Sequence, residues 1–352
     1  MSSERKDEHV RLAEQLRDER RPNGFDDVSF VHHSFNGLRL DDVDTSTEVV
    51  GARWAHPFYI NAMTGGSAMT GRLNAGLATA AAAAGVAIAS GSVSPALRDA
   101  TLADTFTVIR DHAPDAFVFA NVSAEMTVEQ AQTAVDLLDA NALQIHVNPA
   151  QELVMPEGDR DFRGWLDRIE QITAALDVPV VVKEVGFGLS RASILALIDR
   201  GVRTVDVSGT GGTNFIDIEN QRRERSEYRY LAGWGQSSVD CLLDARLGGD
   251  PVDAQLLASG GVRTPLDVVR ALALGASAVG VSGHFLHVLI DSGVDALTAE
   301  LVAWTHQVRT ILTLLGAASV ADLAHTQVLV TGASREFSEL RGIDVSSLAR
   351  RS

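Results

Sequence analysis

Short apolar runs alternate with longer amphipathic stretches over most of the chain. Eight of these runs are rich in β-branched or aromatic residues and are nearly continuous in apolar character, which is typical of strands buried on both faces of a parallel sheet. The eight predicted strands cover residues 58–63, 85–90, 116–121, 142–147, 178–185, 203–208, 254–259 and 276–281.

The segments between these runs have helical periodicity. They include "TVEQAQTAVDLLDA", "FRGWLDRIEQITAAL", "SRASILALIDRG" and "TPLDVVRALALGA", the last of which carries a glycine suited to a helix end. Eight strand-then-helix units within roughly 250 residues match the size of a TIM (β/α)8 barrel. We therefore predict an α/β protein with a TIM barrel. A doubly wound sheet is the alternative, but it requires no eightfold count.

Two parts of the chain lie outside this alternation. Residues 1–50 form a charged arm, and a further helix, "LTAELVAWTHQVRTILTLLGA", precedes a polar tail. No linker rich in glycine, proline or serine divides the chain. We predict an N-terminal arm over 1–50, a barrel over 51–335 and a C-terminal tail over 336–352.

Composition narrows the function classes. The chain has 352 residues, of which 45% are hydrophobic, and 30 basic against 46 acidic residues give a formal charge of −16. Such a charge disfavours nucleic acid and anionic membranes, so an anionic ligand would need a locally basic pocket. Cys241 is the only cysteine, which excludes an intrachain disulfide and a multi-cysteine zinc site.

The first residues are too charged for a signal peptide, and no apolar run approaches the roughly 20 residues of a membrane span. We expect a cytoplasmic protein without a membrane or nucleic-acid partner.

Polar and glycine-rich stretches follow the predicted strands, and TIM barrels bind ligands at these carboxyl ends. The stretch "VSGTGGTNF" at 207–215 offers backbone amides that can approach an anion closely. It is neither a dinucleotide fingerprint nor a Walker loop, and a flexible turn would have a similar composition. The seventh and eighth strands end in the glycines of a barrel phosphate site, beside Arg263.

Lys183 lies within "VVVKEV", where strand alternation points it into the top of the barrel. A buried lysine needs an anionic partner or a shifted pKa. Schiff-base chemistry, contact with an electron-rich cofactor ring and a salt bridge to a neighbouring carboxylate are the three alternatives.

The stretch "HVNPAQE" places His146, Asn148, Gln151 and Glu152 after the fourth strand. One histidine and one glutamate are too few for a closed zinc site. They suit a Mg²⁺ ion that keeps several water ligands and is also coordinated by a substrate phosphate. A buried core histidine and a solvated carboxylate are the structural alternatives. Near the start, "ERKDEHVRL" is either a solvated helix or a source of positive charge for an anionic substrate.

Together these segments resemble the type 2, flavin-dependent isopentenyl diphosphate isomerases over almost the whole chain. The combination of "HVNPAQE", "EGDRDFRGW" and "VKEVGFG" is specific, because other FMN barrels share the glycines but not that set. The matching segments are "RKDEH" at 5–9, "MTGG" at 63–66, "LQIHVNPAQE" at 143–152, "EGDRDFRGWL" at 157–166, "VPVVVKEVGFGLSR" at 178–191, "SGTGGTNF" at 208–215 and "ASGGVRTPLDVVRALALGA" at 258–276.

The resemblance implies a barrel that holds FMN, is active when NADPH has reduced the flavin, and uses Mg²⁺ to interconvert isopentenyl and dimethylallyl diphosphate. It implies tetramers or octamers. The positions that match FMN contacts are Ala62, Met63, Thr64, Gly65, Ser92, Asn121, Lys183, Ser208, Thr213, Gly260, Gly261, Val262, Arg263, Ser282 and Gly283. The substrate positions are Arg5, Lys6, His9, Ser92 and Gln151, the catalytic positions are His146, Asn148 and Gln151, and the Mg²⁺ ligand is Glu152.

The chain departs from the family pattern in two places. The family often has Ser-Gln-Arg after the second strand, where this chain has Ser92-Val93-Ser94 and a later Arg98. Either Arg98 substitutes for that arginine, or other residues hold the diphosphate. After "GGT" the family often has Ser-Trp, and Asn214-Phe215 stand here, so the aromatic ring is kept.

Two other functions fit the sequence less well. A 2-hydroxy-acid oxidase would need a His-Gly-x-Arg stretch after strand seven, and none occurs. A non-catalytic flavin- or phosphate-binding scaffold would keep the glycines but lose Gln151, Glu152 and the N-terminal basic pair, which are all present.

Overall fold

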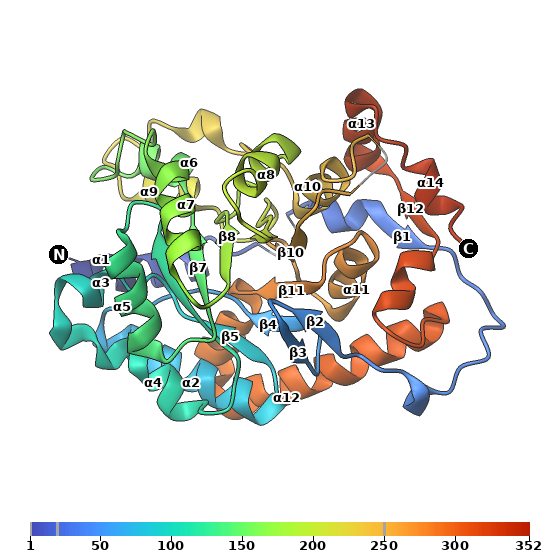
Figure 1. Ribbon diagram of the computed structural model, residues 1–352, viewed down its shortest axis with the longest axis horizontal. Coiled ribbons are helices and arrows are strands. Elements are labelled where there is room, and N and C mark those ends of the chain that lie inside the picture. The colour runs from blue at the N-terminus through green and yellow to red at the C-terminus, as the bar shows by residue number, and fades with distance from the viewer. Residues whose placement is uncertain (1, 19–20, 249–250) are drawn as a thin grey trace.

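The computed structural model describes residues 2–18, 21–248 and 251–352. Eight parallel strands close into a barrel in chain order, with the last strand beside the first (Figure 1). The TIM barrel prediction is therefore confirmed. The barrel strands are β4 (Phe58–Ile60), β5 (Ala87–Ala89), β6 (Val118–Ser123), β7 (Ala142–His146), β8 (Val180–Lys183), β9 (Thr204–Asp206), β10 (Gln255–Ser259) and β11 (Ala278–Val281).

Seven of the eight barrel strands lie within the predicted ranges and are shorter than predicted, whereas β6 begins two residues later than predicted and ends two residues later, at Ser123. Closure is fixed by the parallel register of β11 on β4, where Val279 pairs with Phe58 and Val281 with Ile60. The predicted strands are too long mainly at the positions where a strand ends and a loop begins. Ser208, for example, has a φ of 37°, which ends the extended backbone after β9.

Helices cover the barrel on its outside, and all five predicted helices are present. The predicted helix near the C-terminus forms part of α12, which bends at Gly293 (φ 86°). In Figure 1, α2, α4 and α12 lie along one side of the barrel. The covering helices are α2 (Ala68–Ala84), α4 (Asp104–His112), α5 (Val128–Leu138), α7 (Trp165–Ala175), α8 (Arg191–Ile198), α10 (Ser238–Asp244), α11 (Pro265–Ala273) and α12 (Gly283–Leu315).

Shorter helices lie in the connections: α3 (Ser94–Arg98), α6 (Pro149–Val154), α9 (Phe215–Gln221), and the 3₁₀ helices η3 (Ala100–Leu102), η4 (Arg229–Leu231) and η5 (Ala321–His325).

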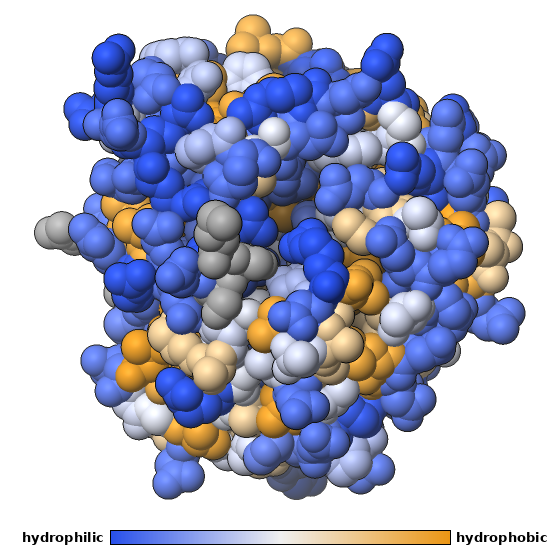
Figure 2. Space-filling model, turned by 90° about the vertical axis from the view of Figure 1, so that its left-hand side faces the viewer, coloured by the Kyte–Doolittle hydropathy of each residue, from blue (hydrophilic) through white to orange (hydrophobic). Residues whose placement is uncertain are grey.

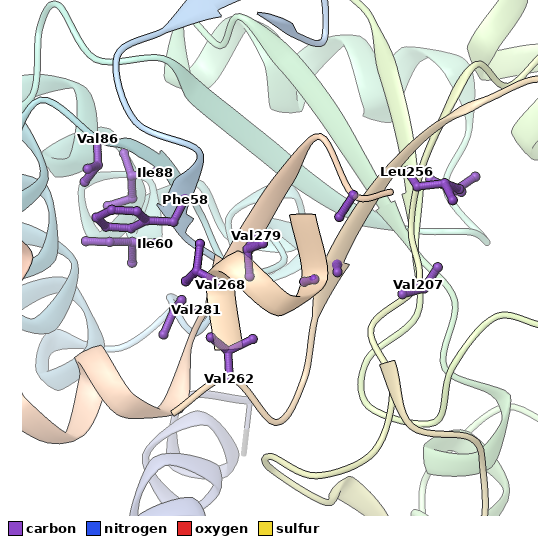
Figure 3. Close-up of a cluster of buried hydrophobic side chains, with 14 of the residues drawn as sticks. Phe58, Ile60, Val86, Ile88, Val207, Leu256, Val262, Val268, Val279 and Val281 are labelled. Atoms are coloured by element: carbon purple, nitrogen blue, oxygen red, sulfur yellow. The ribbon is translucent and has the colours of Figure 1, made fainter. Parts of the chain in front are cut away.

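The apolar core has two layers. The larger layer lies between the strands and the helices, and Figure 3 shows part of it, with Phe58, Ile60 and Ile88 close to one another. The smaller layer fills the amino-terminal end of the barrel. There a hairpin of β2 (Thr47–Val49) and β3 (Ala52–Trp54) joins the strand side chains. That end is therefore closed, which leaves the carboxyl end for a ligand.

The two ends of the chain flank the barrel. Helix α1 (Ser2–Gln15) packs near α2, α9 and α12 at the carboxyl end of the barrel. Strand β1 (Val28–Phe30) pairs antiparallel with β12 (Val328–Val330), so a segment of the arm is joined to the region before the tail. The remaining elements are η1 (Gly24–Asp27), η2 (Leu40–Asp42), α13 (Gly332–Arg341) and α14 (Ser346–Ala349). The predicted division at residues 50 and 335 stays a prediction.

The face that carries the N-terminal helix is mostly hydrophilic (Figure 2). Over the ranges that the structure describes, none of the helices has the length and apolar character needed to cross a membrane.

Candidate active site

A cavity of about 1080 Å³ lies at the carboxyl end of the barrel. The loops that follow all eight strands contribute to its wall, and α1 contributes Arg5, Lys6 and His9. Its volume suits a small-molecule ligand of cofactor size.

Every residue predicted for the site lines this cavity except Gly65. A β-carbon at Gly65 would lie only 2.1 Å from the ring of Phe106, so this glycine allows close packing behind the cavity wall. Its predicted contact with FMN stays a prediction.

Polar contacts hold α1 over the cavity. Asp7 accepts a hydrogen bond from the hydroxyl of Ser67, and Glu14 Oε2 lies 2.7 Å from Nδ1 of His287. These contacts attach the helix to the start of α2 and to α12. They bring the basic residues of α1 to the cavity, where the sequence alone left open whether those residues were merely solvated.

Lys6 and Arg98 both line the cavity and supply positive charge to it. Burial, and then the charges of Arg5 and Arg98, lower the pKa of Lys6 to about 8. Across residues 2–18, 21–248 and 251–352, neither Lys6 nor Arg98 makes a salt bridge, while Arg5 Nη1 lies 3.5 Å from Oε1 of Glu157. Such a local excess of positive charge favours a polyanionic ligand, although the whole chain is acidic.

The side-chain amide of Gln151 is held on both sides. Its Nε2 donates to Oε1 of Glu219 at 2.8 Å, and its Oε1 accepts from Nδ2 of Asn148 at 3.1 Å. Burial acts to raise the pKa of Glu219, but contacts with His9, Gln151 and Arg222 outweigh burial and lower it to about 2. Because Glu219 is therefore anionic, the orientation of the Gln151 amide is fixed.

The carboxylate of Glu152 is tied to its own loop. Its Oε1 accepts from Nδ2 of Asn148 at 2.9 Å, and its Oε2 accepts from the backbone N–H of Asp159 at 2.8 Å. The guanidinium of Arg160 donates to the carbonyl oxygens of Glu152 and Met155. The "EGDR" segment therefore wraps around Glu152 and fixes where its carboxylate lies.

Lys183 is buried beside a carboxylate on the next strand. It pairs in register with Asp206 of β9, and its Nζ donates to the carbonyl oxygen of Glu184 at 2.8 Å. Burial lowers the pKa of Lys183, while Asp206 and Glu184 act in the opposite direction. Asp206 is the anionic neighbour that a buried lysine requires, which fits either a structural pair or a charge held ready for a cofactor ring.

His146 is a neutral imidazole at the cavity wall. Its Nδ1 lies 2.9 Å from Oδ1 of Asn121. Burial, and then the charges of Lys183 and Lys6, lower the pKa of His146 to about 3. It therefore carries no charge at neutral pH and acts as a hydrogen-bonding group in the site.

The glycines after β9 and β10 let two loops touch through their backbones. A β-carbon at Gly260 (φ +87°) would lie 2.0 Å from the carbonyl oxygen of Gly209, and one at Gly212 would lie 3.0 Å from the amide of Gly261. Loop packing is therefore one physical reason for the glycine-rich stretch. Arg263 of this region makes ion pairs with Asp26 and Asp267, so carboxylates already face its charge.

Sequence reasoning missed several polar residues of the site. Gln144 and Asp206 lie inside strands, where a polar residue within an apolar run was the available signal. Asn61 directly follows the first barrel strand, and Glu219 lies in "IDIENQ", which resembles any surface helix and carried no signal. All four are buried.

Sequence comparisons agree on a family. The FMN-dependent dehydrogenase family model matches residues 13–105 and 97–330. Similar curated proteins are the isopentenyl-diphosphate delta-isomerases of Streptomyces sp. (strain CL190), 56% identical over 352 residues, and of Kitasatospora griseola, 57% identical over 352 residues. Each comparison covers 100% of this chain and 96% of the relative. The enzyme of the same name from Latilactobacillus sakei subsp. sakei (strain 23K) is 50% identical over 337 residues, or 96% of each chain.

Solved structures with the same fold include a mandelate oxidase with an FMN adduct, at 20% identity and a TM-score of 0.60 over 92% of each chain. A lactate oxidase from Pediococcus acidilactici is 18% identical, with a TM-score of 0.62, over 88% of this chain and 84% of the other. At such identities the likeness concerns the fold alone.

Proposed function

The chain belongs to the type 2, FMN-dependent isopentenyl-diphosphate delta-isomerases, and from this premise we propose that it interconverts isopentenyl and dimethylallyl diphosphate in isoprenoid biosynthesis, with reduced FMN and Mg²⁺ in the described cavity. NADPH is the proposed reductant. A cytoplasmic location and a homotetramer or homo-octamer are further parts of this proposal.

The cavity fits FMN. The hydroxyl of Thr64 is buried without a hydrogen-bond partner in the described part of the chain, which leaves it free for a ligand. Ser282 and Gly283 begin α12, next to the glycine loops, and a helix start with free amides suits a phosphate. Bound FMN, once reduced, would supply the acid and base for the reaction at its flavin nitrogens, and Lys183 would offer positive charge to the anionic flavin.

The substrate diphosphate has a matching set of cations. Lys6 and Arg98 make no salt bridge among the described residues, and Arg5 and His9 lie on the same helix as Lys6. Arg98 comes from α3, after the Ser92-Val93-Ser94 departure. We propose that it substitutes for the arginine that the family often has two residues after the serine.

Glu152 fits a Mg²⁺ that is shared with substrate. The described ranges contain no group of three or more His, Cys, Asp or Glu side chains able to hold a metal, so a site built from protein alone is not supported there. A single carboxylate suits Mg²⁺ that keeps its waters and binds substrate phosphates. The loop contacts of Glu152 would hold that carboxylate in place.

The reaction moves a double bond by adding a proton at one carbon and removing one from another. The protein groups around the cavity suit orientation better than protonation of an alkene, because His146 is neutral and Glu219 is ionised. Gln151 retains an N–H for a ligand, since its amide group has two donors and Glu219 takes one. We assign Gln151, Asn148 and His146 to positioning substrate against the flavin.

The observation that carries this proposal is the meeting of unpaired cations on α1 and α3 with Lys183 in one cavity. The test is conversion of labelled isopentenyl diphosphate by purified protein with FMN, Mg²⁺ and NADPH under anaerobic conditions. Dimethylallyl diphosphate should form only when the reductant is present. No product from protein that binds FMN normally would overturn the assignment, and oxidation of 2-hydroxy acids would then be assayed.

A further inference from the structure

A row of buried amide side chains connects Asp206 to His146 across the inside of the barrel. Asn61 Nδ2 donates to Asp206 Oδ2 at 2.9 Å, and Gln144 Nε2 donates to Asn61 Oδ1 at 3.2 Å. Asn121 Nδ2 donates to Gln144 Oε1 at 3.2 Å, and Asn121 Oδ1 lies 2.9 Å from Nδ1 of His146. Asp206, Asn61, Gln144 and Asn121 are each at most 2% exposed.

At the Asp206 end of this row, it is clear which group donates each hydrogen bond and which group accepts it. A carboxylate can only accept, and Asp206 also accepts from the hydroxyl groups of Tyr59 and Ser259, at 3.2 Å and 2.8 Å. Asn61 must therefore present its NH₂ group to Asp206. A second contact requires the same orientation, because the backbone N–H of Ala62, which can only donate, lies 2.8 Å from Asn61 Oδ1.

The orientation of each amide determines the orientation of the next one in the row. Since Asn61 faces Gln144 with its oxygen, Gln144 must donate with its nitrogen and turn its own oxygen to Asn121. Asn121 must then donate to Gln144 and turn its oxygen to His146. An oxygen acceptor facing Nδ1 requires a proton on that nitrogen.

We infer that Asn61, oriented both by Asp206 and by the backbone N–H of Ala62, fixes the tautomer of His146 through the amides of Gln144 and Asn121, with the proton on Nδ1 and a bare Nε2. A free neutral imidazole prefers its proton on the other nitrogen, so the row reverses the intrinsic preference. His146 then offers the cavity a hydrogen-bond acceptor rather than a donor.

This consequence deepens the proposed function and rests on it. A bare Nε2 can accept from an N–H or O–H of a ligand, which suits a residue that orients a flavin or a substrate. The low pKa of His146, caused first by burial and then by Lys183 and Lys6, keeps the ring neutral and so preserves the distinction between its two nitrogens.

The tautomer can be measured without the reaction. In FMN-loaded protein with ¹⁵N-labelled histidine, the two-bond and three-bond couplings from ring protons distinguish Nδ1–H from Nε2–H. The His146 signals are those that disappear in His146→Gln. We expect Nδ1–H in the wild type, and we expect the ratio of the two tautomers to fall by about fivefold or more in Gln144→Met, which interrupts the row between Asn61 and Asn121.

Two further variants distinguish an effect on the direction of the hydrogen bonds in the row from an effect on the stability of the protein. Asn61→Leu removes the amide that both Asp206 and the Ala62 N–H orient, so it should also release the tautomer and remains informative if Gln144→Met folds poorly. Ser259→Ala removes a hydroxyl donor to Asp206 that contacts no amide of the row, so it should lose stability and keep Nδ1–H.

An Nε2–H signal in the wild type would overturn the inference, and so would an unchanged ratio in a folded Gln144→Met or Asn61→Leu. If the tautomer behaves as stated but labelled isopentenyl diphosphate is not converted, the proposed function fails and the inference stands.

Discussion

At the residue scale, the orientation of the Gln151 amide is fixed by Asn148 on one side and by Glu219 on the other. Replacing it with alanine should leave FMN bound, since its contacts are to Asn148 and Glu219, but should lower kcat for isomerisation by about 100-fold because the positioning group is lost. Steady-state kinetics and the flavin absorbance of the purified variant check both parts. Gln132→Ala is the matched control, because Gln132 is exposed on α5 and its amide donates to Asp136 of the same helix.

If Gln151→Ala retained full activity with normal FMN content, its assigned role would be wrong.

Arg98 tests how this chain compensates for Val93-Ser94. Arg98→Ala should raise KM for the diphosphate substrate about 5- to 10-fold with a smaller change in kcat, because the arginine lies at the exposed rim and acts through charge-assisted contacts. Arg98→Lys should restore part of the loss. Arg72→Ala, on an exposed position of α2, should behave as wild type. An unchanged KM in Arg98→Ala would mean that other residues hold the diphosphate.

Lys6 gives the site a pH dependence. Burial and the neighbouring Arg5 and Arg98 lower the pKa of Lys6 to about 8. Its charge is therefore present below that pH and is lost above it, so kcat/KM for the anionic substrate should fall as the pH rises through about 8. Lys6→Arg keeps its charge over this range, and its profile should lack that decrease. An identical alkaline decrease in both proteins would assign it to another group.

At the scale of elements, the two glycine loops depend on contact between their backbones. Gly260→Ala should destabilise the protein by about 2 kcal/mol more than Gly85→Ala and should reduce FMN retention, because the new methyl group would meet the carbonyl oxygen of Gly209 at 2.0 Å. Gly85 also has a positive φ, but a β-carbon there meets nothing within 4 Å, so it isolates the backbone cost of about 1 kcal/mol.

Urea unfolding and flavin content would be measured on both variants. Equal stability of the two would show that the loops can separate without loss.

Elements were predictable where burial imposes a strong pattern. All eight barrel strands could be predicted because each is an apolar run bounded by a helical pattern, whereas β1, β2, β3 and β12 are three-residue strands without one. The partners of individual side chains could not be predicted as well from the sequence. The "RKDEH" motif predicted basic residues at the site, but only the folded chain shows Glu219 beneath His9 or Asp206 beside Lys183, because those pairs are distant in sequence.

At the scale of the whole molecule, the barrel separates stability from chemistry. Its carboxyl end carries strained backbone, buried charges and the cavity, and its amino end is closed by aromatic packing. Trp54 of β3 has ring centroids at 5.5 Å from Tyr59, 5.3 Å from Phe117 and 5.8 Å from Phe119, and is 6% exposed. This hairpin lies in the first 57 residues, ahead of β4, so part of the barrel core comes from outside the β/α alternation.

The separation predicts that a defect at the closed end should cost stability and leave the reaction intact. Trp54→Ala should lower the free energy of unfolding by about 3–5 kcal/mol, because it removes a large buried ring. At a temperature where the variant is still folded, kcat and KM should stay close to the wild-type values, since no cavity residue contacts Trp54 among its aromatic neighbours. Trp234→Ala, at a position that is 60% exposed, is the control and should change stability by less than about 0.5 kcal/mol. Denaturant unfolding and steady-state kinetics on the same preparations test both parts of this prediction. A loss of kcat in folded Trp54→Ala would mean that the hairpin supports the geometry of the opposite end of the barrel. The two ends would then not act independently.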